Sequence, residues 1–148
     1  MQISQKCQYG LRAIFELAKH PGAGPVKVSE IAEAQAIPAR FLEVILNQLK
    51  RGGFVESWRG AAGGYTLGRS PADLTLGEII RFIEGPMRPV TCLTGHTEEK
   101  CRLYGSCVFL EIWEEAQKAM SEVFDRVTFK ELIEREARKG VTVSTYNI

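Results

Sequence analysis

One short stretch of the chain has the pattern of β-strands. Residues 54–59 and 65–67 are rich in aromatic and β-branched side chains, and the glycine-rich segment 60–64 separates them. Two such runs around a glycine-rich segment are typical of a β-hairpin with a wide loop. Because the other periodic segments have helical spacing, the sequence predicts a mainly α fold with a small β-hairpin.

Three helical segments precede this hairpin. Residues 4–19 place apolar side chains at helical spacing, and a run of Pro and Gly ends that helix. A short helix follows, with Ser29 as its predicted N-cap. A third helix begins near Pro38 and runs to Arg51, before a pair of glycines. Helix, short helix, helix and basic hairpin, in this order, predict a winged helix-turn-helix domain that binds DNA.

The third helix divides into two faces at about 100° per residue. Its apolar face carries Leu42, Ile45, Leu46 and Leu49. Arg40, Asn47 and Arg51 form a narrow polar strip opposite, with Glu43 to one side. In a winged helix the exposed strip enters the major groove with its N-terminal residues nearest the bases. We therefore expect Arg40 to pair with guanine and Glu43 to accept from a cytosine amino group.

The net charge differs between the two halves of the chain, because the first half has few acidic residues. Residues 1–69 hold nine Lys or Arg and five Glu, whereas residues 70–148 hold ten basic and thirteen acidic residues. Such an asymmetry favours a polyanionic partner at one end, here double-stranded DNA. Arg59, on the glycine-supported hairpin, is expected to sense minor-groove width. The predicted DNA contacts are Lys6, Arg12, Lys27, Ser29, Arg40, Glu43, Arg51, Arg59 and Gly60.

The second half contains a long helix with an apolar seam that continues for about five turns. The seam carries Phe109, Ile112, Trp113, Ala116, Met120, Val123 and Val127. It predicts either packing within the domain or self-association into a homodimer, which would suit a two-fold operator. The expected division is a DNA-binding domain, a cysteine loop, a dimerisation helix with a short terminal helix, and a tail, over residues 1–85, 86–107, 108–137 and 138–148.

Three of the four cysteines, Cys92, Cys101 and Cys107, lie in the aperiodic loop. Thiolates are the preferred ligands of iron–sulfur clusters and zinc, although the spacing matches neither a zinc knuckle nor a ferredoxin run. A regulatory disulfide without metal, or three unrelated small apolar residues, are the alternatives. Candidates for a fourth ligand are His96, Glu98 and Glu99 in the loop and Cys7 or Gln8 on the first helix, of which Cys7 and His96 are preferred. Cys7 lies on the apolar face of the first helix, where it also fits as a small hydrophobic residue.

Other classes of protein are disfavoured. The sequence has neither an apolar run of about 18 residues nor a signal-peptide pattern, so we expect a cytoplasmic protein without a membrane partner. It has two histidines and no nucleophile-elbow or phosphate-loop motif. We therefore expect no catalytic residues and no small-molecule substrate.

The chain resembles the Rrf2 family of winged-helix regulators, which includes IscR, NsrR, RirA and CymR, over residues 1–137. The motifs that carry the resemblance are Ile3-Ser4-Gln5-Lys6, Tyr9-Gly10-Leu11-Arg12-Ala13, Gly24-Pro25-Val26, Phe41-Leu42-Glu43, Arg59-Gly60-Ala61-Ala62-Gly63-Gly64-Tyr65, Leu76-Gly77-Glu78-Ile79-Ile80 and Glu84-Gly85-Pro86, followed by the three-cysteine loop. The resemblance implies a homodimeric transcription factor whose loop cysteines hold an iron–sulfur cluster, with [2Fe–2S] favoured over [4Fe–4S], and whose DNA affinity depends on the cluster. The alternative is a metal-free regulator of the CymR type, controlled by thiol redox chemistry or by a partner protein.

Individual positions carry further implications. Glu43 corresponds to the glutamate that tunes site preference in IscR-like members, and Arg59 to the wing arginine that enters the minor groove. The positions at which relatives supply a fourth ligand are Leu110 and Gln8 in this sequence. The identity of the fourth ligand is therefore open. One hypothesis is that Cys7 of one subunit approaches the cluster of the other.

Overall fold

The computed structural model describes residues 2–94 and 101–145 of the chain. Its elements are α1 (Gln5–Ala18), α2 (Val28–Gln35), α3 (Ala39–Arg51), β1 (Val55–Trp58), β2 (Gly64–Leu67), α4 (Leu76–Glu84), the 3₁₀ turn η1 (Thr91–Thr94), α5 (Leu110–Arg126) and α6 (Phe129–Thr145). The predicted mainly α fold with one antiparallel hairpin is confirmed. Within the described ranges, no helix is both long enough and apolar enough to cross a bilayer.

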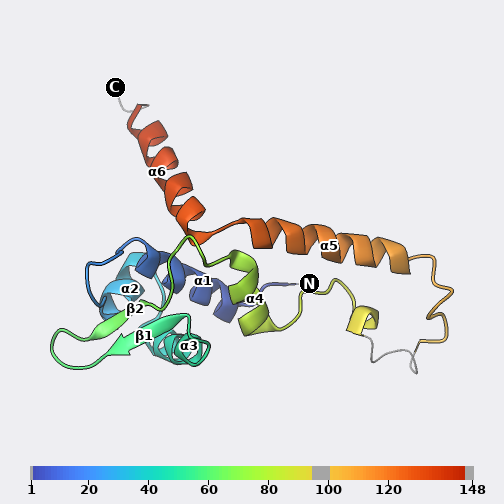
Figure 1. The fold of residues 1–148 in the computed structure, drawn as a ribbon, viewed down its shortest axis with the longest axis horizontal. Helices are drawn as coiled ribbons and strands as arrows, with labels where there is room; N and C mark the ends of the chain where they lie inside the picture. The colour runs from blue at the N-terminus through green and yellow to red at the C-terminus, as the bar shows by residue number, and fades with distance from the viewer. Residues whose placement is uncertain (1, 95–100, 146–148) are drawn as a thin grey trace.

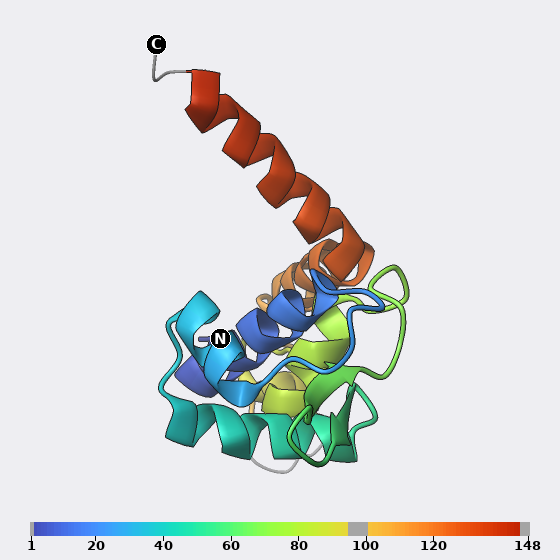
Figure 2. The same ribbon diagram turned by 90° about the vertical axis from the view of Figure 1, so that its left-hand side faces the viewer.

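Helix α1 lies at the centre of the domain and packs against α2, α3, α4 and α6 (Figures 1 and 2). The predicted apolar face of α3 is buried against it, with Leu42, Leu46 and Leu49 fully removed from solvent. This packing leaves the opposite face of α3 at the lower edge of the domain in Figure 2. The amphipathic pattern therefore predicted correctly which face of α3 is in the core.

The hairpin formed by β1 and β2, which we call the wing, is attached to the segment that precedes α2. Val26 and Tyr65 form an antiparallel bridge, with their backbone N–H groups donating over 2.9 and 2.8 Å to the opposite carbonyls. A Cβ atom at Gly64 would lie 2.3 Å from the carbonyl oxygen of Val26, so this close approach requires glycine. The wing is thus fixed to the helix-turn-helix at its base.

The same bridge accounts for an N-cap that the sequence mispredicts. Helix α2 begins at Val28 with Lys27 as the N-cap, so the prediction of Ser29 was wrong. Backbone pairing at Val26 holds the chain extended up to Lys27, and the carboxylate of Glu30 then accepts from the Lys27 N–H over 3.0 Å. The first turn of α2 therefore starts directly after the residue pair that bridges to the wing.

The C-terminal helix is longer than the sequence analysis predicts. Helix α6 continues to Thr145, through the region expected to be a tail after residue 137. Gly140 lies inside this helix, where glycine costs only about 1 kcal/mol relative to alanine. That penalty is too small to end a helix whose first turns pack on the core through Leu132 and Ile133.

Helices α5 and α6 leave the domain in different directions from a common junction (Figures 1 and 2). Backbone hydrogen bonds fix this junction to the start of α4, since Leu76 donates to Val127 and Phe129 donates to Leu74, both over 3.0 Å. The guanidinium of Arg81 also pairs with the carboxylate of Asp125. The end of α5 is therefore joined to the helical domain that carries the wing.

A buried carboxylate joins α1 to α2. Glu16 is buried, and its carboxylate accepts from the Gln35 amide at 2.6 Å and lies 2.9 Å from the ammonium of Lys19 and 3.1 Å from the His20 ring. Burial by itself raises the pKa of Glu16, but hydrogen bonds from Gln35, Lys19 and His20 outweigh that effect and hold the pKa below its usual 4.5. Glu16 is therefore ionised at neutral pH.

We expect Glu16→Gln to lower the free energy of unfolding at pH 7 by about 1–2 kcal/mol, because a neutral amide accepts more weakly from these donors. Since the folded-state pKa is depressed, the contribution is complete above pH 4.5 and is lost as the pH falls below it. Urea unfolding should thus show a difference between wild type and variant that shrinks from pH 7 to pH 3. Glu33→Gln, at an exposed site on α2, is the control. A difference that does not change with pH would contradict this account.

Candidate nucleic-acid interface and cysteine segment

The outward side of α3 carries side chains that can reach bases. Arg40, Glu43, Asn47 and Arg51 are all exposed, as the polar strip predicts. The guanidinium of Arg40 lies over the ring of Phe41, 4.7 Å from its centre, which restricts its orientation by a cation–π contact. The N-terminal end of α3 therefore presents an oriented cation beside the Glu43 carboxylate.

Side-chain contacts connect the wing to α3. Lys50, near the end of α3, donates to the hydroxyl of Ser57 on β1. Across the hairpin, the indole N–H of Trp58 donates to Thr66 Oγ1 over 3.1 Å. Arg59 and Gly60 follow at the exposed tip, where Gly60 has φ +99°, a value that side chains disfavour. The tip is thus held at a defined position relative to α3.

The structure separates the other predicted DNA contacts into two groups. Lys6, Lys27 and Ser29 are exposed and free to meet a phosphate backbone. Arg12 is half-buried, donates to the backbone carbonyl of Gln35 at the end of α2 and stacks on Tyr9. Its guanidinium therefore holds α2 on α1, and a DNA contact by Arg12 would have to use its remaining N–H groups.

Two apolar residues on the exposed side of α3 were missed by the sequence analysis. Val44 is 65% exposed and Phe41 is 46% exposed. At about 100° per residue, Val44 lies about 40° from Arg40, next to the polar strip on the side away from Glu43. The helical spacing of α3 therefore predicts that Val44 is exposed, although the prediction of DNA contacts considered only polar side chains.

The cysteine segment, residues 86–107, carries three unpaired thiols. Cys92, Cys101 and Cys107 are each half-buried and free, so their sulfurs are available for chemistry. Among the residues that the structure describes, no three Cys, His, Asp or Glu side chains are grouped closely enough to hold a metal ion. The candidate ligand His96 lies outside the described residues. The donor types thus suit an iron–sulfur cluster, but the described positions do not converge on one point.

Cys7 has a different environment from the other thiols. Its side chain is fully buried and packs against Ile80 and Met87. Met120 and Phe124 of α5 are partly buried against this group of apolar side chains. Burial, together with the nearby carboxylate of Glu84, raises the pKa of Cys7 to about 12. These surroundings favour the interpretation of Cys7 as a small hydrophobic residue rather than as a ligand.

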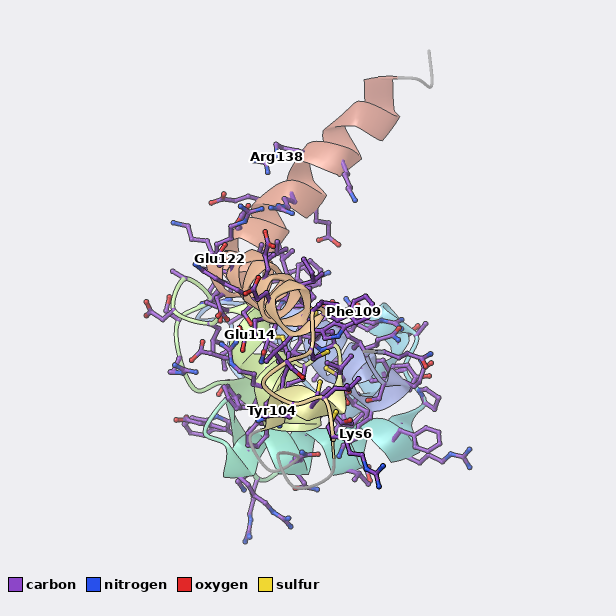
Figure 3. All side chains as sticks on the ribbon, turned by 90° about the vertical axis from the view of Figure 1, so that its right-hand side faces the viewer. Lys6, Tyr104, Phe109, Glu114, Glu122 and Arg138 are labelled. Carbon is purple, nitrogen blue, oxygen red and sulfur yellow. The ribbon has the colours of Figure 1, made fainter. Side chains whose placement is uncertain are left out.

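The apolar seam of α5 is packed within the chain at one end of the helix and exposed at the other. Met120 lies near the C-terminal end and packs on α1 and α4 within the same chain. Phe109 and Ile112 remain 59% and 55% exposed, and the Phe109 ring stacks on Trp113 with 6.3 Å between centroids. Figure 3, which looks along α5, shows Phe109 on one side of the helix and acidic side chains on the other. The C-terminal part of the seam therefore packs within the chain, as one of the two interpretations predicts, and self-association through the exposed N-terminal part stays a prediction.

Comparison with known proteins decides the family. The profile of the Rrf2 family, described as an iron-dependent transcriptional regulator, matches residues 3–135. The chain belongs to the Rrf2 family. Its sequence is 39% identical to the regulator CymR of Bacillus subtilis over 132 residues, which are 89% of each chain.

Solved structures of Rrf2 proteins agree with this assignment. The structure of CymR, titled the global cysteine regulator of B. subtilis, superposes with a TM-score of 0.76 at 36% identity, covering 91% of this chain and 98% of CymR. The structure of T. potens IscR superposes with a TM-score of 0.71 at 34% identity, covering 92% and 88% of the two chains. This Rrf2 protein is accordingly a winged-helix transcriptional regulator that binds DNA, and it is not an enzyme.

Proposed function

We propose that this protein binds a two-fold operator as a homodimer, and that an iron–sulfur cluster held by Cys92, Cys101 and Cys107 sets its operator affinity. One observation carries the proposal: all three half-exposed thiols lie on the single segment that leads from the DNA-binding domain into α5. The description of the family as iron-dependent supports it. When bound, a cluster supplies a centre that is labile towards oxidants and iron loss.

The link from the thiols to α5 is direct in the backbone. The carbonyl of Cys107 accepts from the N–H of Leu110 over 3.1 Å, at the first turn of α5. The proposal requires Cys92 and Cys101 to move towards Cys107, because the described thiols are not grouped as metal ligands. A movement of Cys107 changes how α5 begins, and so changes the surface that faces the second subunit.

The DNA side of the proposal assigns roles by position. Arg40 and Glu43 specify bases from the N-terminal end of α3, and Arg59 enters the minor groove beside Gly60. Exposed residues around them position the protein on the phosphate backbone without reading sequence. These residues are Lys6, Lys27, Ser29 and Arg51.

Arg59→Ala is expected to weaken binding about tenfold at operators with A·T-rich flanks, and by much less with G·C-rich flanks, because A·T tracts narrow the minor groove and strengthen its negative potential. Fluorescence anisotropy with two duplexes that differ only in the flanks measures the difference. Arg126→Ala, at an exposed position at the end of α5, controls for loss of charge. An equal loss on both duplexes would refute the minor-groove role.

A second candidate is thiol-based control without metal. The ungrouped positions of Cys92, Cys101 and Cys107 favour it, as does the similarity to a protein titled a cysteine regulator. In this case oxidation of these half-buried thiols, rather than iron, changes DNA affinity.

Anaerobic purification distinguishes the two candidates. Iron and sulfide in comparable amounts, with visible absorption, would support the cluster. Colourless protein with three reactive thiols, whose oxidation changes the affinity for DNA, would support thiol control instead. The DNA target can be obtained in both cases by selection from a pool of random duplexes.

A further inference from the structure

An apolar hollow lies between α1 and the outward side of α3, and Lys6 alone of its lining residues has a role in the proposed function. It has a volume of about 390 Å³ and is lined by Gln5, Lys6, Tyr9, Phe41, Val44 and Ile45. Ile45 forms its buried floor, whereas Val44 lies on the outward side of the helix. Its exposed lining residues Lys6, Phe41 and Val44 are therefore next to the side chains that face DNA in the proposed function.

The packing of the fold does not explain why an apolar side chain is exposed at position 44 of α3. Val44 is 65% exposed and lies about 40° from Arg40, next to the polar strip of α3. A valine also has a lower helix propensity than the alanine or lysine that would suit a solvated site. Neither packing in the core nor helix propensity therefore favours valine at this position, and a contact with another molecule would account for it.

The charges around the hollow restrict what that molecule can be. Lys6 lines it, and the Arg40 guanidinium lies over the ring of Phe41 at its edge. An apolar hollow beside two cations is complementary to a partner surface on which an apolar group lies close to negative charge. In the major groove of DNA that group is the C5 methyl of thymine, the one apolar base edge displayed there.

Given the DNA-binding function proposed above, we propose that Val44 and Phe41 read thymine through its C5 methyl group. Arg40 stacks on Phe41, so the apolar contact and the predicted guanine contact come from adjacent positions on α3. This protein therefore recognises a guanine and a neighbouring thymine with one turn of helix.

The test removes the methyl group and leaves the base pair unchanged. After selection of an operator from random duplexes, each thymine is replaced singly by deoxyuridine, and dissociation constants are measured by fluorescence anisotropy. We expect one or two positions in each half-site at which the replacement weakens wild-type binding about fourfold, as for loss of one buried methyl group.

Variants then assign the contact to its side chain. Val44→Ala should reduce the deoxyuridine penalty at one of these positions to less than about twofold, whereas Asn47→Ala, on the same face, should retain the full penalty. Because Val44 is exposed, Val44→Ala should fold as the wild type does, and thermal unfolding checks this.

Three results would overturn the proposal. They are operators without any methyl-sensitive thymine, a penalty that is unchanged in Val44→Ala, and a Val44→Ala variant whose main defect is weaker self-association. The last result would assign the hollow to a second copy of the chain. Failure to select any duplex would instead refute DNA binding itself, so the two hypotheses fail in distinguishable ways.

Discussion

Replacing Ile112 with glutamate should convert the protein from a dimer into a monomer and weaken operator binding by about 100-fold or more. Ile112 is 55% exposed on α5, beside the stacked rings of Phe109 and Trp113. A charge at the centre of an apolar contact loses its hydration without gaining a partner. A monomer then binds one half-site and loses the avidity of two. Sedimentation equilibrium and anisotropy measure the two effects.

The control is the same charge on the opposite side of the helix. Lys118→Glu introduces a glutamate at an exposed position of α5, next to Glu122 and away from the apolar seam. It should leave the oligomeric state unchanged. A dimeric Ile112→Glu variant with wild-type affinity would show that the exposed part of α5 is not the dimer interface.

Cys101→Ser should abolish iron binding and make operator affinity independent of iron. A serine hydroxyl is a poor substitute for a thiolate, and two remaining thiols on the segment cannot hold a cluster of the expected kind. Iron and sulfide content, measured after anaerobic reconstitution, should fall at least about tenfold from the wild-type level.

Cys7→Ala provides the matched control for this prediction. Because Cys7 is buried against Ile80 and Met87, its replacement should lower stability by about 1 kcal/mol and leave iron content unchanged. Loss of iron in Cys7→Ala but not in Cys101→Ser would reverse the assignment and make Cys7 a ligand.

Local patterns predicted the elements and their buried faces. The spacing of Leu42, Ile45 and Leu49 identified the core side of α3, and the glycines between two strand-like runs identified the wing. Both depend on residues close in sequence, so periodicity is sufficient. The N-cap of α2 was mispredicted because it depends on the bridge between Val26 and Tyr65, which are distant in sequence.

The candidate site was less predictable, because it depends on what covers each side chain. The seam of α5 has one continuous pattern, yet Met120 packs on its own domain while Ile112 faces solvent. Similarly, Arg12 has the charge of a phosphate contact but donates to the carbonyl of Gln35. The spacing of residues in the sequence can identify such candidates, but it does not show which neighbours surround each side chain in the fold. Those neighbours decide its role.

Operator affinity, measured on one anaerobic preparation before and after chelation of its iron with the thiols kept reduced, tests the central claim most directly. The account predicts that affinity changes at least about tenfold on iron removal and returns on reconstitution with iron and sulfide. Equal affinity of the iron-loaded and iron-free protein, within about twofold, would contradict it.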